Sequence, residues 1–138
     1  MRSIALLLLG MAAMLILVAF PRPVQAATLT VTKTDDTFDG VCDADCSLRE
    51  AIALADPGDN IDIPPGEYTL SLGVQITFGK DLTLTGAGAE NTIIQADPDP
   101  GTASIRVFNI TSGEVSIRHG KVAGDGGAIN NSGTLTLI

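Results

Sequence analysis

Pairs of apolar residues separated by a single polar residue recur along most of this chain, and this repetition is the strongest constraint on its fold. The pairs alternate at the two-residue period of a β-strand, and Gly, Asp, Asn or Pro separates most of them. Several recur at intervals of 20 or 21 residues, namely Ile61 and Leu82, Ile94 and Val115, Val115 and Leu135, and Ile117 and Leu137. A period near twenty made of strands and turns predicts an all-β parallel β-helix, a solenoid whose coils stack their strands.

The alternative for a chain with many short strands is an antiparallel β-sandwich. That fold predicts tight hairpins with two-residue Asn-Gly or Asp-Gly turns between matched strands. Asp125-Gly126 comes nearest to such a turn, but it runs on into Gly127. We therefore favour the solenoid.

Residues 1–26 have the layout of a secretory signal peptide. Arg2 supplies a positive charge, residues 4–20 form an uncharged apolar run, and Ala26 ends a stretch that a signal peptidase would read. The alternative is an uncleaved membrane anchor, for which the run is slightly short. We expect export through the secretory pathway, an extracellular or cell-surface location, and no transmembrane segment in the mature chain.

The mature part, residues 27–138, is strongly acidic. It keeps six basic and all sixteen acidic residues, which gives a formal charge of −10. An acidic chain without basic runs repels phosphate backbones, so nucleic acid is excluded as a partner.

Cys42 and Cys46 are the only cysteines of the chain. In an oxidising compartment, two cysteines this close together predict one disulfide. A zinc site is the rival interpretation, but two thiols supply only half of the ligands and the single histidine, His119, is far along the chain.

The segment after Cys46 predicts a helix of about two turns. Ser47 and Glu50 match a capping box, and residues 48–55 carry one apolar stripe that must lie on an apolar surface. Residues 29–32 predict a strand. We therefore divide the mature chain into an N-terminal cap, residues 27–58, with this strand, the acidic disulfide loop and the helix, and the first coils of a β-helix, residues 59–138.

The heptapeptide Cys46-Ser47-Leu48-Arg49-Glu50-Ala51-Ile52 resembles the signature of the CSLREA N-terminal domain. Residues 65–70 and 82–88 resemble coils of pectin-lyase-like β-helices, and residues 126–129 resemble the GGAI motif of polymorphic outer-membrane proteins. The resemblance implies a right-handed parallel β-helix whose N-terminal end is closed by the short helix. Arg49 lies off the apolar stripe, where we expect an ion pair with an acidic residue of the loop, worth under ~1 kcal/mol if exposed.

Five aspartates of the cap are candidates for calcium, which takes six to eight oxygen ligands. An EF-hand loop beginning at the first of them would need an acid at its twelfth position, where Cys46 lies, so that motif fails. We favour a solvated acidic loop over a calcium site and expect no other cofactor. The five are Asp35, Asp36, Asp39, Asp43 and Asp45.

The pectin-lyase-like resemblance also implies polysaccharide lyases and hydrolases, which would need catalytic residues in this chain. The basic cluster Arg118, His119 and Lys121 is a candidate for contact with a glycan, although solvated turn residues are the simpler interpretation. A hydrolase needs two paired carboxylates, and the late acids Glu114 and Asp125 have no evident partners. We therefore expect no enzyme activity in this chain.

Asn109 and Asn130 lie one repeat apart and predict an asparagine ladder inside the turns. Residues 109–111 and 130–132 also match N-glycosylation acceptors.

The leading functional hypothesis is an exported, non-enzymatic β-helix for adhesion or carbohydrate contact. One alternative is a polysaccharide lyase or hydrolase whose active site lies in coils downstream, and another is an inactive truncated fragment. Residues 135–138 begin a strand with no cap after it. We therefore expect the N-terminal part of a longer surface protein, with self-association through the open C-terminal coil.

Overall fold

Strands and one short helix make up the computed structural model, which describes residues 25–99, 102–123 and 128–138. The strands are β1 (Thr28–Thr30), β2 (Asn60–Ile63), β3 (Gly66–Thr69), β4 (Ile76–Phe78), β5 (Leu82–Gly86), β6 (Thr92–Gln95), β7 (Phe108–Ile110), β8 (Glu114–Arg118), β9 (Lys121–Ala123), β10 (Ile129–Asn131) and β11 (Thr134–Leu137). The helix is α2 (Leu48–Leu54). Two sets of residues named above lie outside the described residues. They are residues 1–24 of the expected signal peptide and the two glycines of the GGAI motif.

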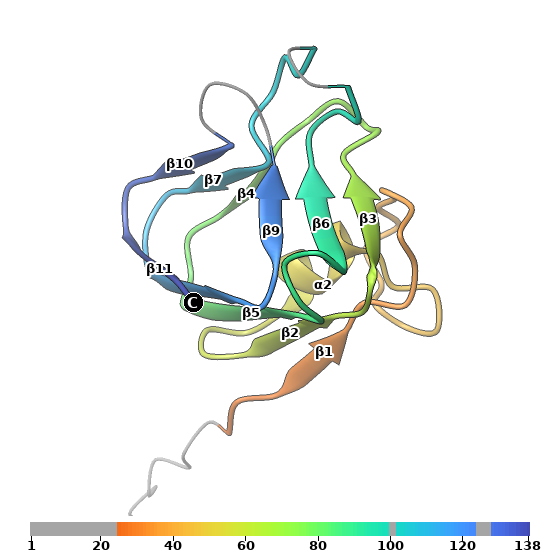
Figure 1. Ribbon diagram of the computed structural model, residues 1–138. Coiled ribbons are helices and arrows are strands. Elements are labelled where there is room, and N and C mark those ends of the chain that lie inside the picture. The colour runs from red at the N-terminus through yellow and green to blue at the C-terminus, as the bar shows by residue number, and fades with distance from the viewer. Residues whose placement is uncertain (1–24, 100–101, 124–127) are drawn as a thin grey trace, which may run out of the picture.

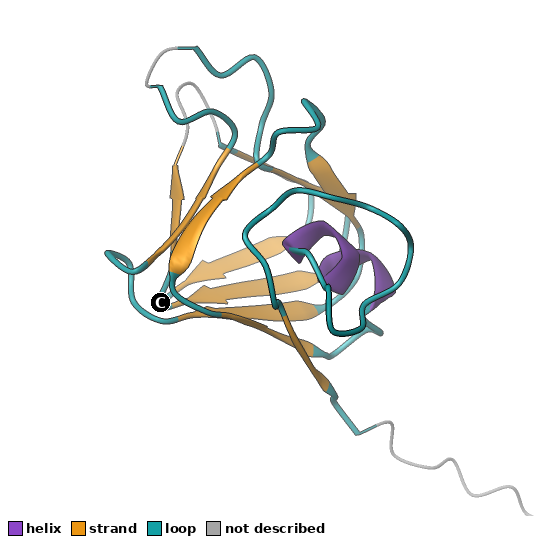
Figure 2. Cartoon of the chain, turned by 90° about the vertical axis from the view of Figure 1, so that its right-hand side faces the viewer, coloured by secondary structure: helices purple, strands orange, loops and turns teal. Residues whose placement is uncertain are grey.

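The strands form three parallel sheets that surround one apolar core (Figures 1 and 2). Sheet A has the order β1-β2-β5-β8-β11, sheet B the order β3-β6-β9, and sheet C the order β10-β7-β4. From β2 onward the chain enters sheets A, B and C in turn and then returns to sheet A. The expectation of an all-β fold with parallel sheets and one short helix is confirmed.

The register of sheet A supports part of the predicted periodicity and corrects the rest. Leu135 lies beside Val115 and Leu137 beside Ile117, as the sequence predicted. Ile61, however, lies beside Leu84 rather than Leu82, so the predicted match was wrong by two residues. A shift of two keeps the same face inward, which is why the apolar pattern alone did not reveal it.

The match between Ile94 and Val115 was also wrong. Ile94 belongs to β6 of sheet B and lies beside Tyr68, whereas Val115 belongs to β8 of sheet A. The connection between β6 and β7, residues 96–107, places Val115 of β8 33 positions after its neighbour Leu82 of β5. An interval of 21 at this point therefore joins residues of two different sheets.

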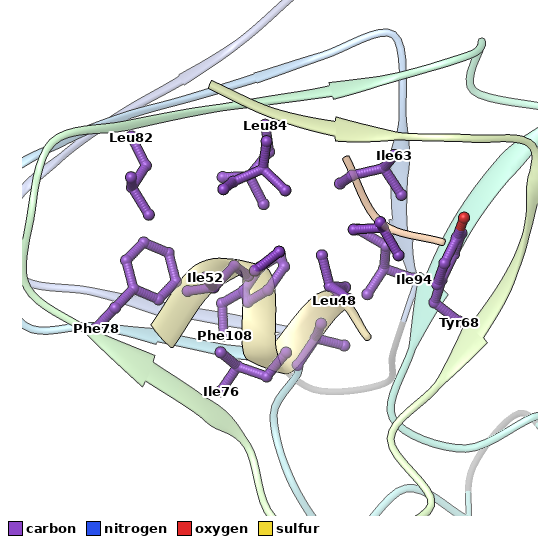
Figure 3. Packing of buried hydrophobic residues seen from close by; sticks show 14 of the residues in the cluster. Leu48, Ile52, Ile63, Tyr68, Ile76, Phe78, Leu82, Leu84, Ile94 and Phe108 are labelled. Atoms are coloured by element: carbon purple, nitrogen blue, oxygen red, sulfur yellow. The ribbon is translucent and has the colours of Figure 1, made fainter. Parts of the chain in front are cut away.

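The inward side chains of all three sheets form a single buried cluster (Figure 3). Leu84 and Ile63 reach it from sheet A, Ile94 from sheet B and Phe108 from sheet C. The rings of Phe78 and Phe108 meet edge to face, with their centroids 5.9 Å apart. Aromatic pairs favour this arrangement because the positive edge of one ring faces the negative face of the other.

Helix α2 packs against β2 and β4 and covers the core with its apolar stripe. Leu48, Ala51 and Ile52 are buried, as the stripe predicted, while Leu54 on the opposite face is exposed. No helix among the described residues is long and apolar enough to cross a membrane.

Strand β1 ends earlier than the expected strand over residues 29–32. Val31 still donates its backbone N–H to Asp62 O (2.9 Å), but the N–H of Thr32 turns to Cys46 O (2.8 Å). The chain leaves sheet A at this point to join the loop that carries the cysteines.

Replacing Ile52 with alanine tests whether α2 covers the core. Ile52 is 1% exposed, so we expect Ile52→Ala to lower the free energy of unfolding by about 2–5 kcal/mol, because it leaves a cavity under the helix. Leu54→Ala is the matched control, since Leu54 is 46% exposed and its loss should cost only about 0.5 kcal/mol. Denaturant unfolding measures both, and equal losses would contradict the role of α2 as a cover.

Candidate functional site

The cysteine pair organises the loop before α2. Cys42 and Cys46 lie at disulfide distance, with Cα atoms 4.4 Å apart, as the sequence predicted. Cys46 is fully buried, and its backbone N–H donates to the hydroxyl of Thr32 (2.7 Å). With both thiols paired to each other, the alternative of a zinc site loses its ligands.

The capping box at the start of α2 is present, and it also holds the acidic loop. Glu50 N donates to Ser47 Oγ (3.2 Å), while Ser47 N donates to Glu50 Oε2 (2.7 Å). The other carboxylate oxygen of Glu50 accepts from the backbone N–H of Asp39 (2.8 Å). Burial alone would raise the pKa of Glu50, but the N–H groups of Ser47 and Asp39 hold this pKa below its ordinary value.

Arg49 forms a buried ion pair rather than an exposed one. Its Nε and Nη2 donate to the two carboxylate oxygens of Asp36 (2.7 and 3.0 Å), and the two side chains are 11% and 3% exposed. Arg49 also donates to Val74 O (2.8 Å), and Asp36 accepts from the N–H of Leu72 (3.0 Å). The pair therefore joins the acidic loop, α2 and the loop before β4, and the sequence-based value for an exposed pair does not apply to it.

The other four aspartates proposed for calcium differ from one another in what they contact. Asp39 and Asp43 accept hydrogen bonds from backbone N–H groups two residues later, at Val41 and Asp45 (2.8 and 2.9 Å). Asp45 pairs with Lys33 (3.0 Å), and Asp35 is exposed. Within the described residues, no three His, Cys, Asp or Glu side chains are grouped to hold a metal ion. The structure thus does not gather the five aspartates into a ligand set.

The three basic residues proposed for glycan contact are divided between two sheets. Arg118 ends β8 of sheet A, Lys121 begins β9 of sheet B, and His119 lies at the corner between them. His119 has a positive φ of 51°, and its backbone O accepts from Gly88 N (2.6 Å). Gly86 packs against this corner, where a Cβ atom would lie 2.6 Å from His119 O. The backbone therefore places the three at the end of β8, at the corner and at the start of β9.

The outward face of sheet A carries a row of small, uncharged polar side chains. The register places one residue of each strand side by side, and four of the five carry a hydroxyl group while the fifth is an amide. Neighbouring strands lie about 4.8 Å apart, so the row is about 19 Å long. Its members are Thr28, Asn60, Thr83, Ser116 and Thr136.

A polar hollow of about 270 Å³ opens on this face over β5, β8 and β11. Thr83, Ser116 and Thr136 line it together with the charged residues Asp81, Glu114 and Arg118. Asp81 Oδ1 accepts from the backbone N–H of Glu114 (2.8 Å), and Arg118 Nε donates to Ser116 Oγ (3.3 Å). The hollow thus offers hydroxyl, carboxylate and guanidinium groups to a polar ligand.

This hollow was not predicted from the sequence, in which Glu114 has no evident partner. The register pairs Leu82 with Val115, so Asp81, directly before β5, lies beside Glu114, the first residue of β8. Aligning Asp81-Leu82-Thr83 with Glu114-Val115-Ser116 would have indicated the pairing, but their interval of 33 residues differs from the predicted period near twenty.

The predicted asparagine ladder is present in a different place. Asn130 Nδ2 donates to Asn109 Oδ1 (2.7 Å), and Asn109 Nδ2 reaches Thr77 Oγ1 (3.4 Å). The three residues lie side by side on β10, β7 and β4 of sheet C. The ladder therefore runs across the strands and not inside the turns.

A second hollow, of about 390 Å³, lies beside the cap and is mainly apolar. Phe38, Leu72 and Val74 line it and are each more than half exposed, and Ile52, Ile76 and Arg49 also contribute.

Comparisons of the chain with protein-family models, with curated proteins and with solved structures give no match. A functional assignment therefore has to rest on the residues of this chain.

Replacing Asp36 with asparagine tests the buried ion pair. The change leaves the guanidinium of Arg49 buried without a countercharge, so we expect the free energy of unfolding to fall by about 3–5 kcal/mol. Asp35→Asn alters the exposed neighbour and should stay within about 0.5 kcal/mol of the wild type. If denaturant unfolding gives Asp36→Asn a value as small as this control, the pair does not hold the cap.

The lowered pKa of Glu50 predicts a pH dependence of stability. Its carboxylate stabilises the fold fully above the ordinary value of 4.5, and this contribution is lost as the pH falls through the lower pKa of the folded state. Glu50→Gln should therefore be less stable at pH 7 and should lose less additional stability between pH 5 and pH 3. Thermal unfolding across this range measures the effect, with the exposed Glu67→Gln as control; parallel curves for the wild type and Glu50→Gln would contradict it.

Proposed function

We propose that this chain is an exported, non-enzymatic surface protein in which a right-handed parallel β-helix presents sheet A to carbohydrate. The cyclic order in which the chain enters sheets A, B and C supports the solenoid. Crossovers between parallel strands are right-handed in nearly all proteins, which supports the handedness.

The N-terminal cap supports the same proposal. A solenoid needs a unit at its end that covers the apolar interior, and α2 with its disulfide and ion pair has this position. The capping box and Arg49 lie within the heptapeptide that resembles the CSLREA signature. The resemblance therefore concerns residues with clear structural roles.

The observation that carries the functional proposal is the polar face of sheet A. Sugars are bound through hydroxyl groups that both donate and accept hydrogen bonds, and the row and the hollow provide matching side chains. Two carboxylates and one guanidinium line the hollow, and the chain has a net charge of −8. This balance disfavours polyuronates and other polyanions, so a neutral glycan is the ligand class that we propose.

The non-enzymatic part of the proposal rests on how the hollow uses its carboxylates. Asp81 already accepts the backbone N–H of Glu114, which ties one of the two acids to the neighbouring strand. A lyase or hydrolase with its active site in further coils is the alternative, and product formation distinguishes it.

Binding of the purified exported protein to an array of neutral and acidic glycans tests the proposal. We expect binding to neutral glycans, and Arg118→Ala should weaken it about tenfold or more, because hydrogen bonds to a charged group are lost. Arg106→Ala is the matched control, since Arg106 is exposed and does not line the hollow.

Three outcomes would contradict the proposal. They are absence of glycan binding, equal effects of the two arginine variants, and release of unsaturated uronate or reducing sugar by the chain. The last outcome would favour the enzyme alternative.

A further inference from the structure

Among the described residues, Ala27 is the first with a hydrogen bond to the rest of the fold. Its backbone N–H donates to Asp59 Oδ1 (2.7 Å), and its carbonyl oxygen accepts from the N–H of Asn60 (2.9 Å). Strand β1 begins at the next residue and lies beside β2 in sheet A (Figure 1). Gln25 and Ala26, directly before it, are exposed and belong to no strand. The bond between Ala26 and Ala27 is therefore where the described chain passes from solvent into the fold.

Asp59 is a buried carboxylate that no cationic side chain of the described residues neutralises. It is 4% exposed, and its second carboxylate oxygen, Oδ2, accepts from the N–H of Asp56 (2.8 Å). Neither of the two ion pairs found in the described part of the chain includes it. Burying a carboxylate costs free energy that hydrogen bonds and a nearby positive charge offset. Asp59 has the hydrogen bonds, but both come from neutral backbone N–H groups.

The sequence predicts that a signal peptidase cuts the chain at this same bond, after Ala26. Hydrolysis adds water across the Ala26–Ala27 amide. The C–N bond breaks, Ala26 keeps a carboxylate, and the nitrogen of Ala27 becomes an α-ammonium group. An α-amino group has an ordinary pKa of about 7.7–8.0, so it is mostly charged at neutral pH. The cut therefore creates a positive charge at the nitrogen that lies 2.7 Å from Asp59 Oδ1.

We propose that the carboxylate of Asp59 is the binding site for the α-ammonium group of Ala27 in the exported chain. The two groups form an ion pair that fixes the first residue of the mature protein at the start of sheet A. The ammonium group keeps an N–H for Asp59 Oδ1 and adds a charge, and charge-assisted hydrogen bonds are roughly twice as strong as neutral ones. This inference rests on the export that is part of the proposed function, and it gives the cleavage itself a structural role.

The site for the ammonium group is formed by the folded chain around Asp59. This residue lies between α2 and β2, where its N–H donates to Asp56 O (3.1 Å) and its carbonyl oxygen accepts from the N–H of Thr83 in β5 (3.0 Å). The end of the cap and the neighbouring strand thus hold the carboxylate in place, so little conformational entropy is lost when the ion pair forms. The precursor lacks the ammonium group at this position. The fold therefore reaches its full stability only after the signal peptide has been removed.

Mass spectrometry of the exported protein and thermal unfolding of defined chains test the inference. The exported protein should begin at Ala27. The mature chain with a free Ala27 amine should have a Tm about 4 °C or more above that of the same chain with this amine acetylated, because acetylation keeps an N–H but removes the charge. A chain that begins at Gln25 should have the Tm of the acetylated form, because its terminal charge lies two residues before Ala27.

Asp59→Asn separates the ion pair from any other effect of the terminal amine. It preserves the size of the side chain but removes its negative charge, so the difference in Tm between the free and acetylated chains should disappear. Asp56→Asn is the matched control, since Asp56 is an exposed acid of the same turn, and this variant should retain the difference. If Asp59→Asn does not fold, the comparison of free and acetylated wild-type chains still decides the question.

The inference is overturned if the exported protein begins at another residue, if the free and acetylated chains have equal Tm values, or if the difference persists in Asp59→Asn. None of these measurements involves a glycan. A failure of the ion pair is therefore distinguishable from a failure of the proposed carbohydrate binding.

Discussion

In a stack of parallel strands, each inward side chain is buried only if another strand or a cap covers it on both sides along the stack. The rest of this structure depends on that constraint. The apolar layer beneath β2 is completed on one side by β5 and on the other by β1 and α2. A helix of seven residues is too short to be stable alone. The capping box and the Asp36–Arg49 pair link α2 to the acidic loop and to the loop before β4. The cysteine pair closes the acidic loop directly before the helix. The acidic loop is therefore a structural part of the cap.

How far the sequence predicts the structure depends on the distance between interacting residues along the chain. The capping box joins residues three positions apart and the disulfide joins residues four positions apart, so both were recognisable from local spacing. The alternation of apolar and polar residues gave the strands and their inward faces, because that pattern depends only on the two-residue period.

The register was less predictable, because connections of different length separate the strands. Neighbours in sheet A are 23 residues apart between β2 and β5, 33 between β5 and β8, and 20 between β8 and β11. A search for one fixed period finds the last interval and fails at the first two. An ion pair between Arg49 and an acidic residue of the loop was expected, but its burial was not. Residues 71–75, which cover the pair, follow β3, and nothing in their local sequence indicates contact with the cap.

The same register that fills the core also determines the outward surface. When Leu82 lies beside Val115 inside, Asp81 must lie beside Glu114 and Thr83 beside Ser116 outside, whatever the length of the connection between β6 and β7. The polar hollow on sheet A is therefore protected from changes in the loops, because a slip of one residue would turn the inward leucines and valines to solvent. Loop lengths in this fold can vary at low cost, while the outward row of hydroxyl groups stays in place. The apolar core and the candidate binding surface are thus two faces of one alignment, and a substitution that shifts the register should alter both together.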